Sequence, residues 1–205
     1  MKGFILKIRK AKNEDVIVTV LSKNRVESYY RFYGARHSIL QVGNLIDFKL
    51  QESKKGFMPQ IRKISHISFP WISYSVRLSI WQNFIKLFEP HLKEVIHIDR
   101  FYFELLLKIA KKWHKQNSKR LAIEAYIEIL EYERRLHKNE FCYICENLLN
   151  KQVRLMRAYI PTHPKCINGY SYEKNQIFEL FETKSTINID DNIIDELFNI
   201  LLKGF

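Results

Sequence analysis

Three cysteines and one histidine in the second half of the chain have the types and spacing of metal ligands. Cys142 and Cys145 are two residues apart, and His163 and Cys166 repeat this spacing after 17 intervening residues. Each short gap lets both members of a pair reach one ion, and four such ligands form the closed tetrahedral shell of structural zinc. All four positions would be protein ligands, which leaves no open position for a catalytic water.

Other interpretations of these cysteines stay open. A thioredoxin-like redox pair would also use CxxC, but the expected βαβ context is missing. The three cysteines could be unrelated, and His163, which precedes Pro164, could be a surface histidine. A disulfide framework is disfavoured because the count is odd and the cytosol keeps thiols reduced.

A second candidate site is a predicted strand on which aromatic and cationic residues alternate. If Tyr30 and Phe32 point inward, then Tyr29, Arg31 and Tyr33 point outward together. Rings that stack on bases, placed between cations that contact phosphates, are what single-strand binding requires. With the surrounding cations, the predicted DNA-binding set is Lys7, Arg9, Lys10, Lys12, Arg25, Tyr29, Arg31, Tyr33, Arg36, His37, Arg62 and Lys63. The alternative is a solvated basic barrel whose tyrosines pack against the predicted helical domain.

A further basic group surrounds a tryptophan near the end of a predicted helix. Cations are favourable at a helix C-terminus in any case, so this group could be a solvated helix end. It could also extend the nucleic-acid surface or form a pocket for an acidic, hydrophobic-ended peptide tail, and the sequence does not choose. The predicted tail-binding residues are Lys108, Lys111, Lys112, Trp113 and Lys115.

The charge distribution favours a polyanionic partner. The formal net charge is +12, and residues 1–67 hold 14 Lys and Arg against 5 Asp and Glu. Such clustering is the electrostatic footprint of a nucleic-acid surface. No Gly-rich phosphate loop, GxSxG or HExxH motif occurs, so we expect no enzymatic activity.

The chain has no sequence signature of a membrane protein or a secreted protein. No apolar run approaches the roughly 18 residues of a membrane span, and the first residues lack the apolar stretch of about 7 to 15 residues of a secretory signal. We therefore expect a cytoplasmic protein with no membrane partner.

The elements that position these sites change character along the chain. Short runs rich in Val, Ile, Tyr and Phe predict strands over residues 4–10, 15–21, 26–33, 45–51 and 57–64. Five short antiparallel strands suit a small closed barrel such as the OB-fold, and an SH3-like barrel is the alternative.

Helical periodicity follows Pro70. One apolar stripe runs from Leu78 to Leu92, and two more lie over residues 103–113 and 121–136. Asp99 and Ser118 are the expected N-caps of the latter two helices. Two further helices are expected over residues 172–182 and 190–203. The predicted fold class is thus α+β, with an OB-fold domain over residues 1–68 and a helical domain over residues 69–205 that contains the zinc segment, residues 142–166.

With these parts in order, the chain resembles the RecO family of DNA recombination mediators. The matching stretches are GFIL at residues 3–6, EDVIVTVL at 14–21, YGARHS at 33–38 and the cysteine segment at 142–166. The resemblance covers essentially the whole chain, and the order of the motifs is more specific than any one of them. Family members that carry zinc commonly have CxxC twice, whereas the second pair here is HxxC.

The resemblance implies a function as well as a fold. It implies a DNA repair protein of the cytoplasm and nucleoid that binds single- and double-stranded DNA and anneals complementary strands. It further implies action with RecR, contact with the acidic C-terminal tail of single-strand-binding protein, and help in loading RecA, with structural zinc as the cofactor. Two alternatives stay open: an adaptor whose basic faces bind acidic protein tails, and an RNA-binding OB-fold protein.

Overall fold

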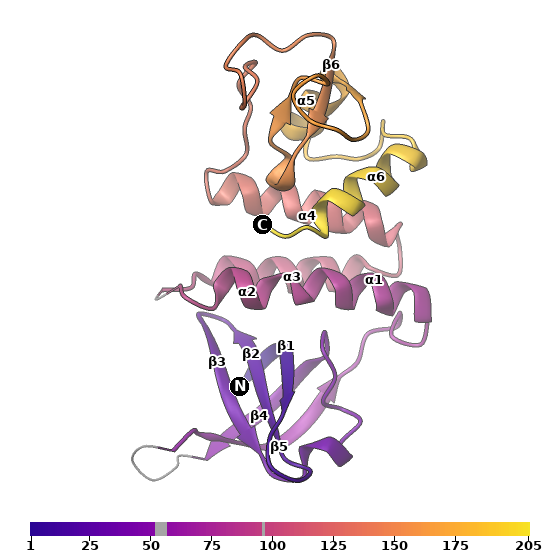
Figure 1. The fold of residues 1–205 in the computed structure, drawn as a ribbon. Helices are drawn as coiled ribbons and strands as arrows, with labels where there is room; N and C mark the ends of the chain where they lie inside the picture. Colours follow the sequence, from indigo (N-terminus) through magenta and orange to yellow (C-terminus); the bar gives the residue numbers. More distant parts are fainter. Residues whose placement is uncertain (52–56, 96) are drawn as a thin grey trace. The chain divides into compact units, whose positions relative to one another are not determined.

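A computed structural model describes residues 1–51, 57–95 and 97–205 (Figure 1). The contacts divide the chain into two compact units, Met1–Lys115 and Gln116–Phe205, and each is described by itself. The predicted domain boundary after residue 68 follows the last barrel strand, although the contacts group the next three helices with the barrel. That boundary stays a prediction.

The first unit contains a closed barrel of five strands. They are β1 (Lys2–Lys10), β2 (Val16–Ser22), β3 (Arg25–Arg31), β4 (Leu45–Gln51) and β5 (Gln60–Ile67). The order around the barrel is β1-β2-β3-β5-β4, and this arrangement confirms the predicted OB-fold. One pair departs from the prediction, because β3 and β5 run parallel where they close the barrel. The predicted turn at residues 53–56 lies outside the described residues.

The barrel core comes from the alternation of side chains along the strands. Val16, Val18 and Val20 of β2 are all buried, whereas the side chain of Ile17 between them is half-buried. The same period gives each strand one apolar face inside the barrel. The other fully buried members include Ile5, Ile46, Phe48 and Ile61.

Three helices complete the first unit. They are α1 (Ser75–Lys86), α2 (Phe88–Leu92) and α3 (Arg100–Lys112). The single stripe predicted from Leu78 to Leu92 is split at Leu87, because Pro90 has no N–H to donate to the preceding turn. Asp99 caps α3 as predicted, since its side chain accepts a hydrogen bond from the Phe101 N–H.

Three tryptophans form an aromatic cluster within this unit. Trp71, Trp81 and Trp113 are at most 1% exposed, with ring centroids 5.0 to 6.1 Å apart. Each indole N–H donates to a backbone carbonyl, and Trp81 donates to Gly43 at 2.8 Å. Gly43 has a φ of +91°, and a Cβ there would lie 2.7 Å from the Trp81 ring. Glycine is therefore required at this position.

The second unit combines helices with a small sheet. Its helices are α4 (Ser118–Tyr132), α5 (Lys174–Thr183) and α6 (Asp191–Leu201). The predicted cap of α4 was wrong by one residue, because the Asn117 side chain accepts from the Lys119 and Arg120 N–H groups. Ser118 is instead the first helical residue, and its side chain is buried.

Between α4 and α5, the chain forms a segment that we call the metal lobe, residues 139–173. It contains β6 (Gln152–Leu155), β7 (Pro161–Thr162) and β8 (Tyr172–Glu173), in the order β7-β6-β8. The sequence did not predict this sheet, because strands of two to four residues are too short for a period to emerge. Across the described ranges, no helix has the length and apolar character to cross a membrane.

Candidate functional site

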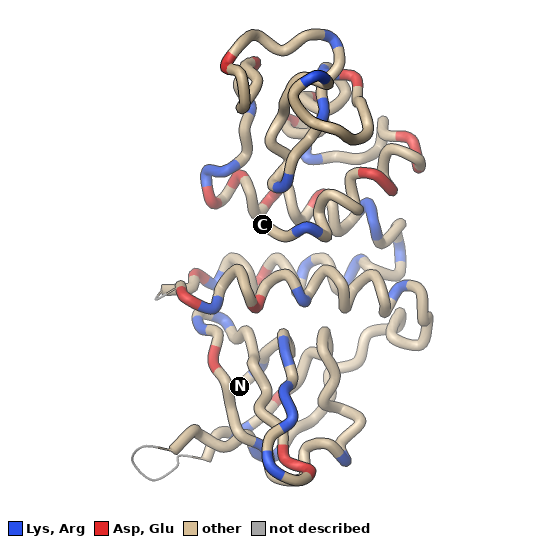
Figure 2. The backbone as a smooth tube through the Cα atoms, in the orientation of Figure 1, with Lys and Arg blue, Asp and Glu red and all other residues tan. Residues whose placement is uncertain are grey.

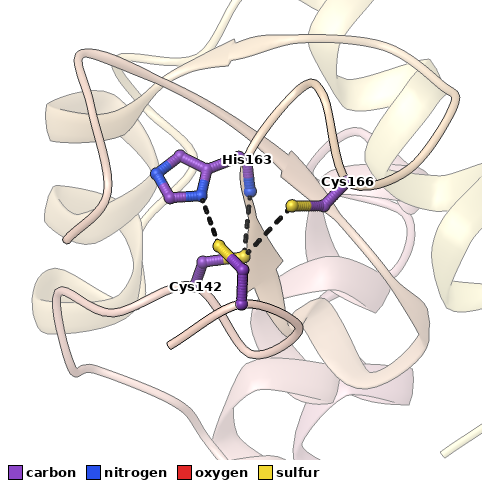
Figure 3. Close-up of side chains that lie close together, drawn as sticks. Cys142, His163 and Cys166 are labelled. Atoms are coloured by element: carbon purple, nitrogen blue, oxygen red, sulfur yellow. Dashed lines mark hydrogen bonds between the residues drawn. The ribbon is translucent and has the colours of Figure 1, made fainter. Parts of the chain in front are cut away.

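The four predicted metal ligands come together in the metal lobe. The ligand atoms of Cys142, Cys145, His163 and Cys166 all lie within 4.8 Å of one another. Figure 3 shows three of these side chains converging on one point, with the Cys142 and Cys166 sulfurs 3.8 Å apart. The His163 Nδ1 lies 3.2 Å from the Cys145 Sγ. These four residues could hold a metal ion.

Short backbone features set the positions of the ligands. An isolated bridge between Phe141 and Leu148 encloses the first pair of cysteines, and the turn is closed by the Glu146 N–H donating to the Cys142 carbonyl. Glu146 takes a φ of +58°, a left-handed conformation that completes this tight turn. The second pair follows β7, where the Cys166 N–H donates to the His163 carbonyl.

A hydrogen bond outside the cluster orients the histidine. The His163 Nε2 lies 2.9 Å from the Leu148 carbonyl oxygen, so that Nε2 carries the proton and donates it. The other nitrogen, Nδ1, then presents its lone pair to the cysteines. Metal-binding histidines are commonly held in this way by a carbonyl or carboxylate.

The backbone also favours a thiolate at Cys142. Burial alone would raise the pKa of this thiol, but the N–H groups of Cys145, His163 and Ile144 point at the sulfur and lower its pKa to about 6. The thiolate is the form that binds a metal. With three sulfurs and one imidazole in a closed arrangement, the donor set fits a structural site rather than a catalytic one.

A second candidate site lies at one end of the barrel. We call it the cationic-aromatic end, and it consists of Arg31, Phe32, Tyr33, Arg36, His37 and Arg62. The guanidinium of Arg36 lies over the Tyr33 ring at 5.6 Å, and that of Arg62 over the Phe32 ring at 5.7 Å. The Phe32 and Tyr33 side chains are 40% and 61% exposed, so their rings are available for stacking. Figure 2 shows where Lys and Arg lie along the barrel backbone.

Asp15 holds this end together. Its carboxylate accepts a hydrogen bond from the Tyr30 hydroxyl and a second from the Tyr33 N–H at 2.7 Å. These bonds, first that of Tyr30, lower the pKa of Asp15. They fix Tyr33 in a left-handed conformation with a φ of 52°, which turns the chain out of β3.

The predicted orientation was wrong for Tyr29 and Phe32, whereas Tyr33 is exposed as expected. Tyr29 is 1% exposed because it pairs with Val18, and both side chains lie in the core. Tyr29 therefore cannot stack on a base. Phe32, which was expected to point inward, is exposed because β3 ends at Arg31 and the alternation stops there.

Several other predicted DNA-binding residues lie near this end. Val16 of β2 pairs with Lys10 of β1 on one side and with Arg31 of β3 on the other. Lys12 follows in the turn between β1 and β2. Arg9, Lys10, Lys12 and Lys63 are exposed. Arg36 also contacts the partly exposed Glu14, an ion pair of small energy in water.

Two of the predicted residues are engaged elsewhere. Lys7 forms an ion pair with Glu89 at 3.0 Å. Arg25 starts β3 whereas Arg31 ends it, so six residues, or about 20 Å of strand, separate their positions. The sequence alone cannot show this separation, because cations at both ends of a strand contribute equally to a count of charge.

Arg25 instead lines a groove at the opposite end of the barrel. This groove has a volume of about 590 Å³, with an apolar floor that includes Phe69, Phe103 and Leu107. Four cations also line it: Lys2, Lys23, Arg25 and Lys111.

The predicted tail-binding residues are not all exposed. Trp113 is fully buried, and its N–H donates to the Arg77 carbonyl, so it cannot contact a partner. Lys108, Lys112 and Lys115 are exposed on or just after α3, and Lys111 lines the groove.

Comparison with known proteins bears on the barrel. No curated protein matches the chain. Residues 1–72, which include all five barrel strands, match the family model described as RecO N terminal. The barrel is therefore similar to the RecO N-terminal domain, and the match over these residues supports membership of the RecO family and a RecO-type role in DNA repair and recombination.

Proposed function

We propose that the protein is a recombination mediator that binds single- and double-stranded DNA through the cationic-aromatic end and anneals complementary strands. The observation that carries this proposal is the pair of exposed rings, Phe32 and Tyr33, each with a guanidinium over it. Stacking on such a ring is worth about 1 to 3 kcal/mol per base and tolerates any sequence.

The mechanism needs no covalent chemistry. Arg36, Lys12 and their neighbours would neutralise phosphates, while the two rings hold unstacked bases. Annealing then follows for two reasons. Neutralised phosphate backbones repel each other less, and bases that are unstacked from their neighbours are free to pair with a complementary strand. Binding of this kind has little sequence preference and a strong salt dependence. The protein therefore performs no enzymatic step in this mechanism.

The test is the salt dependence of binding to a labelled oligo-dT strand. Lys12→Ala with Arg36→Ala should weaken binding to all sequences alike and flatten the log–log salt slope by about 1.4, since single strands release roughly 0.7 counterions per neutralised phosphate. Lys86→Ala with Lys93→Ala removes the same charge from exposed positions elsewhere in the unit and should leave the slope unchanged. An equal slope in both variants would contradict the proposal.

We also propose that the metal is zinc and that its role is structural. Cysteine and histidine are the ligands that structural zinc sites use. Cys142, Cys145, His163 and Cys166 would hold the ion, which would supply a crosslink rather than a reactive centre.

The partners form a separate part of the proposal. We infer that the groove containing Lys111 binds the acidic C-terminal tail of single-strand-binding protein, because its cations surround an apolar floor. The family further suggests action with RecR and assistance to RecA on the nucleoid. Annealing of strands coated with single-strand-binding protein should be faster when the tail is intact. Equal rates with and without the tail would contradict the groove assignment.

Two alternatives give different results in the same assays. An RNA-binding protein would prefer RNA over DNA of equal length. An adaptor for acidic tails would bind DNA only incidentally, so Lys2→Ala with Lys111→Ala would remove tail binding and DNA binding together. The mediator should keep DNA binding in that variant.

A further inference from the structure

A cavity of about 940 Å³ lies beside the metal centre. It is formed within the second unit by the start of β6, by β8 with the first turn of α5, and by the loop that carries His163. Its polar lining includes Asn150, Lys151, Gln152, Lys165, Lys174 and Asn175. Neither the proposed DNA surface nor the proposed tail groove includes any of these residues.

Positive charge is concentrated around this cavity. The second unit holds 12 Lys and Arg against 13 Asp and Glu, whereas residues 147–178, which lie between Glu146 and Glu179, hold five against one. The basic residues of this segment therefore lie in an otherwise acidic unit.

Two of the five cations have structural roles. Arg154 donates to the Ser171 hydroxyl and to the Pro164 and Ile167 carbonyls, and Arg157 donates to the Phe205 carbonyl. The three lysines remain at the cavity.

Little within the lobe neutralises these lysines. Lys151 and Lys165 are exposed and form no ion pair with any residue that the structure describes, and Lys174 lies 3.4 Å from Glu140. Glu173 is the one acid in the lining.

The lining distinguishes the possible ligands. The groove on the barrel has an apolar floor, which suits a peptide with hydrophobic side chains. The cavity has ammonium groups alternating with side-chain amides, both of which donate hydrogen bonds to phosphate oxygens. Leu149 and Pro164 are the purely apolar side chains of this lining, fewer than in the groove, so an acidic peptide with hydrophobic side chains suits the groove better.

We propose that this cavity binds the phosphodiester backbone of a nucleic acid, as a second strand-binding site separate from the barrel. This inference extends the proposed annealing function, because a protein with two strand sites can hold both partners of a pairing reaction. The metal centre would act as its scaffold, since His163 and Pro164 belong to the same lining.

The experiment uses the full, metal-loaded chain and two labelled, non-complementary oligo-dT strands that report energy transfer when one molecule holds both. The test variant is Lys151→Gln with Lys165→Gln. The matched control, Arg134→Gln with Lys203→Gln, removes two exposed cations of the same unit that do not line the cavity. Metal content is measured in each, because Lys165 adjoins a ligand.

We expect the test variant to lose energy transfer while the control and the metal content stay unchanged. When the barrel substitutions Lys12→Ala and Arg36→Ala are also present, the test pair should flatten the remaining salt slope by about 1.4. Unchanged energy transfer in the test variant, or an equal loss in the control, would overturn the inference. Displacement of DNA from the cavity by oligo-glutamate at equal charge would also overturn it, in favour of an acidic peptide ligand.

The two proposals fail differently. Normal binding of a single oligo-dT strand by the Lys12→Ala, Arg36→Ala variant would show that the proposed barrel surface is wrong. The cavity is tested independently, by the loss of energy transfer in the Lys151→Gln, Lys165→Gln variant.

Discussion

The barrel and the metal lobe are both small β structures, but different forces hold them together. The barrel has strands of seven to nine residues and a core of fully buried Ile, Val and Phe side chains. The metal lobe has strands of two to four residues, and Phe141, Tyr143 and Leu148 in it are more than half exposed. The lobe does bury some side chains, such as Val153, Tyr159 and Tyr172, but a segment of this size buries little apolar surface, so the proposed metal crosslink would supply much of its stability.

The largest expected effect is unfolding of the metal lobe while the barrel stays folded. Cys142→Ser should abolish metal binding and remove hydrogen-exchange protection from the lobe, because structural zinc contributes about 10 to 16 kcal/mol to folding of such segments. Amide exchange by mass spectrometry and metal analysis measure both effects, and barrel amides serve as the internal control. Lobe protection that survives both the substitution and a strong chelator would contradict the metal's structural role.

The converse substitution should destabilise the barrel and leave the metal lobe unchanged. Phe48→Ala removes a core ring that contacts Tyr29 and should lower the free energy of unfolding of the first unit by about 3 to 5 kcal/mol. The metal content should stay the same. Phe57→Ala, at a side chain that is 75% exposed, should change the stability by less than about 0.5 kcal/mol. A comparable loss in both variants would mean that the core is not where the structure has it.

A smaller effect is expected in the tryptophan cluster. Trp81→Phe keeps a ring but leaves the buried Gly43 carbonyl without its donor, which should cost about 1 to 3 kcal/mol in urea unfolding. Leu87→Phe, at a half-buried position nearby in sequence, tests whether any aromatic change in this region has the same effect. Equal stability of Trp81→Phe and the native protein would show that the hydrogen bond contributes nothing.

The smallest effect depends on pH. The folded-state pKa of Asp15 is lowered by the Tyr30 hydroxyl and the Tyr33 N–H, so ionised Asp15 stabilises the fold. Its contribution is full above the unfolded-state pKa of about 3.9 and is lost as the pH falls through the lower folded-state value. The difference in unfolding free energy between native protein and Asp15→Asn should therefore be present at pH 7 and shrink under acid conditions. A difference that grows as the pH falls would reverse this assignment.

Some features could be predicted because they depend on local pattern. The barrel strands have a clear period of two, and the four metal ligands have a spacing that few other sites share. The features that could not be predicted depend on tertiary contacts. Tyr29 is inside because of its pairing with Val18, and Trp113 is buried by two other tryptophans. Neither relationship can be read from neighbours in the sequence.

The closing pair of the barrel has a consequence for its dynamics. β3 and β5 share one register pair, Tyr30 with Gln60, supported by the Tyr30 N–H donating to the Pro59 carbonyl at 2.9 Å. Every other neighbouring pair has at least three register positions. We therefore expect the barrel to open first at this β3–β5 seam, which adjoins the exposed rings. A nucleic-acid strand bound across both β3 and β5 would slow the separation of these two strands without altering the rest of the barrel.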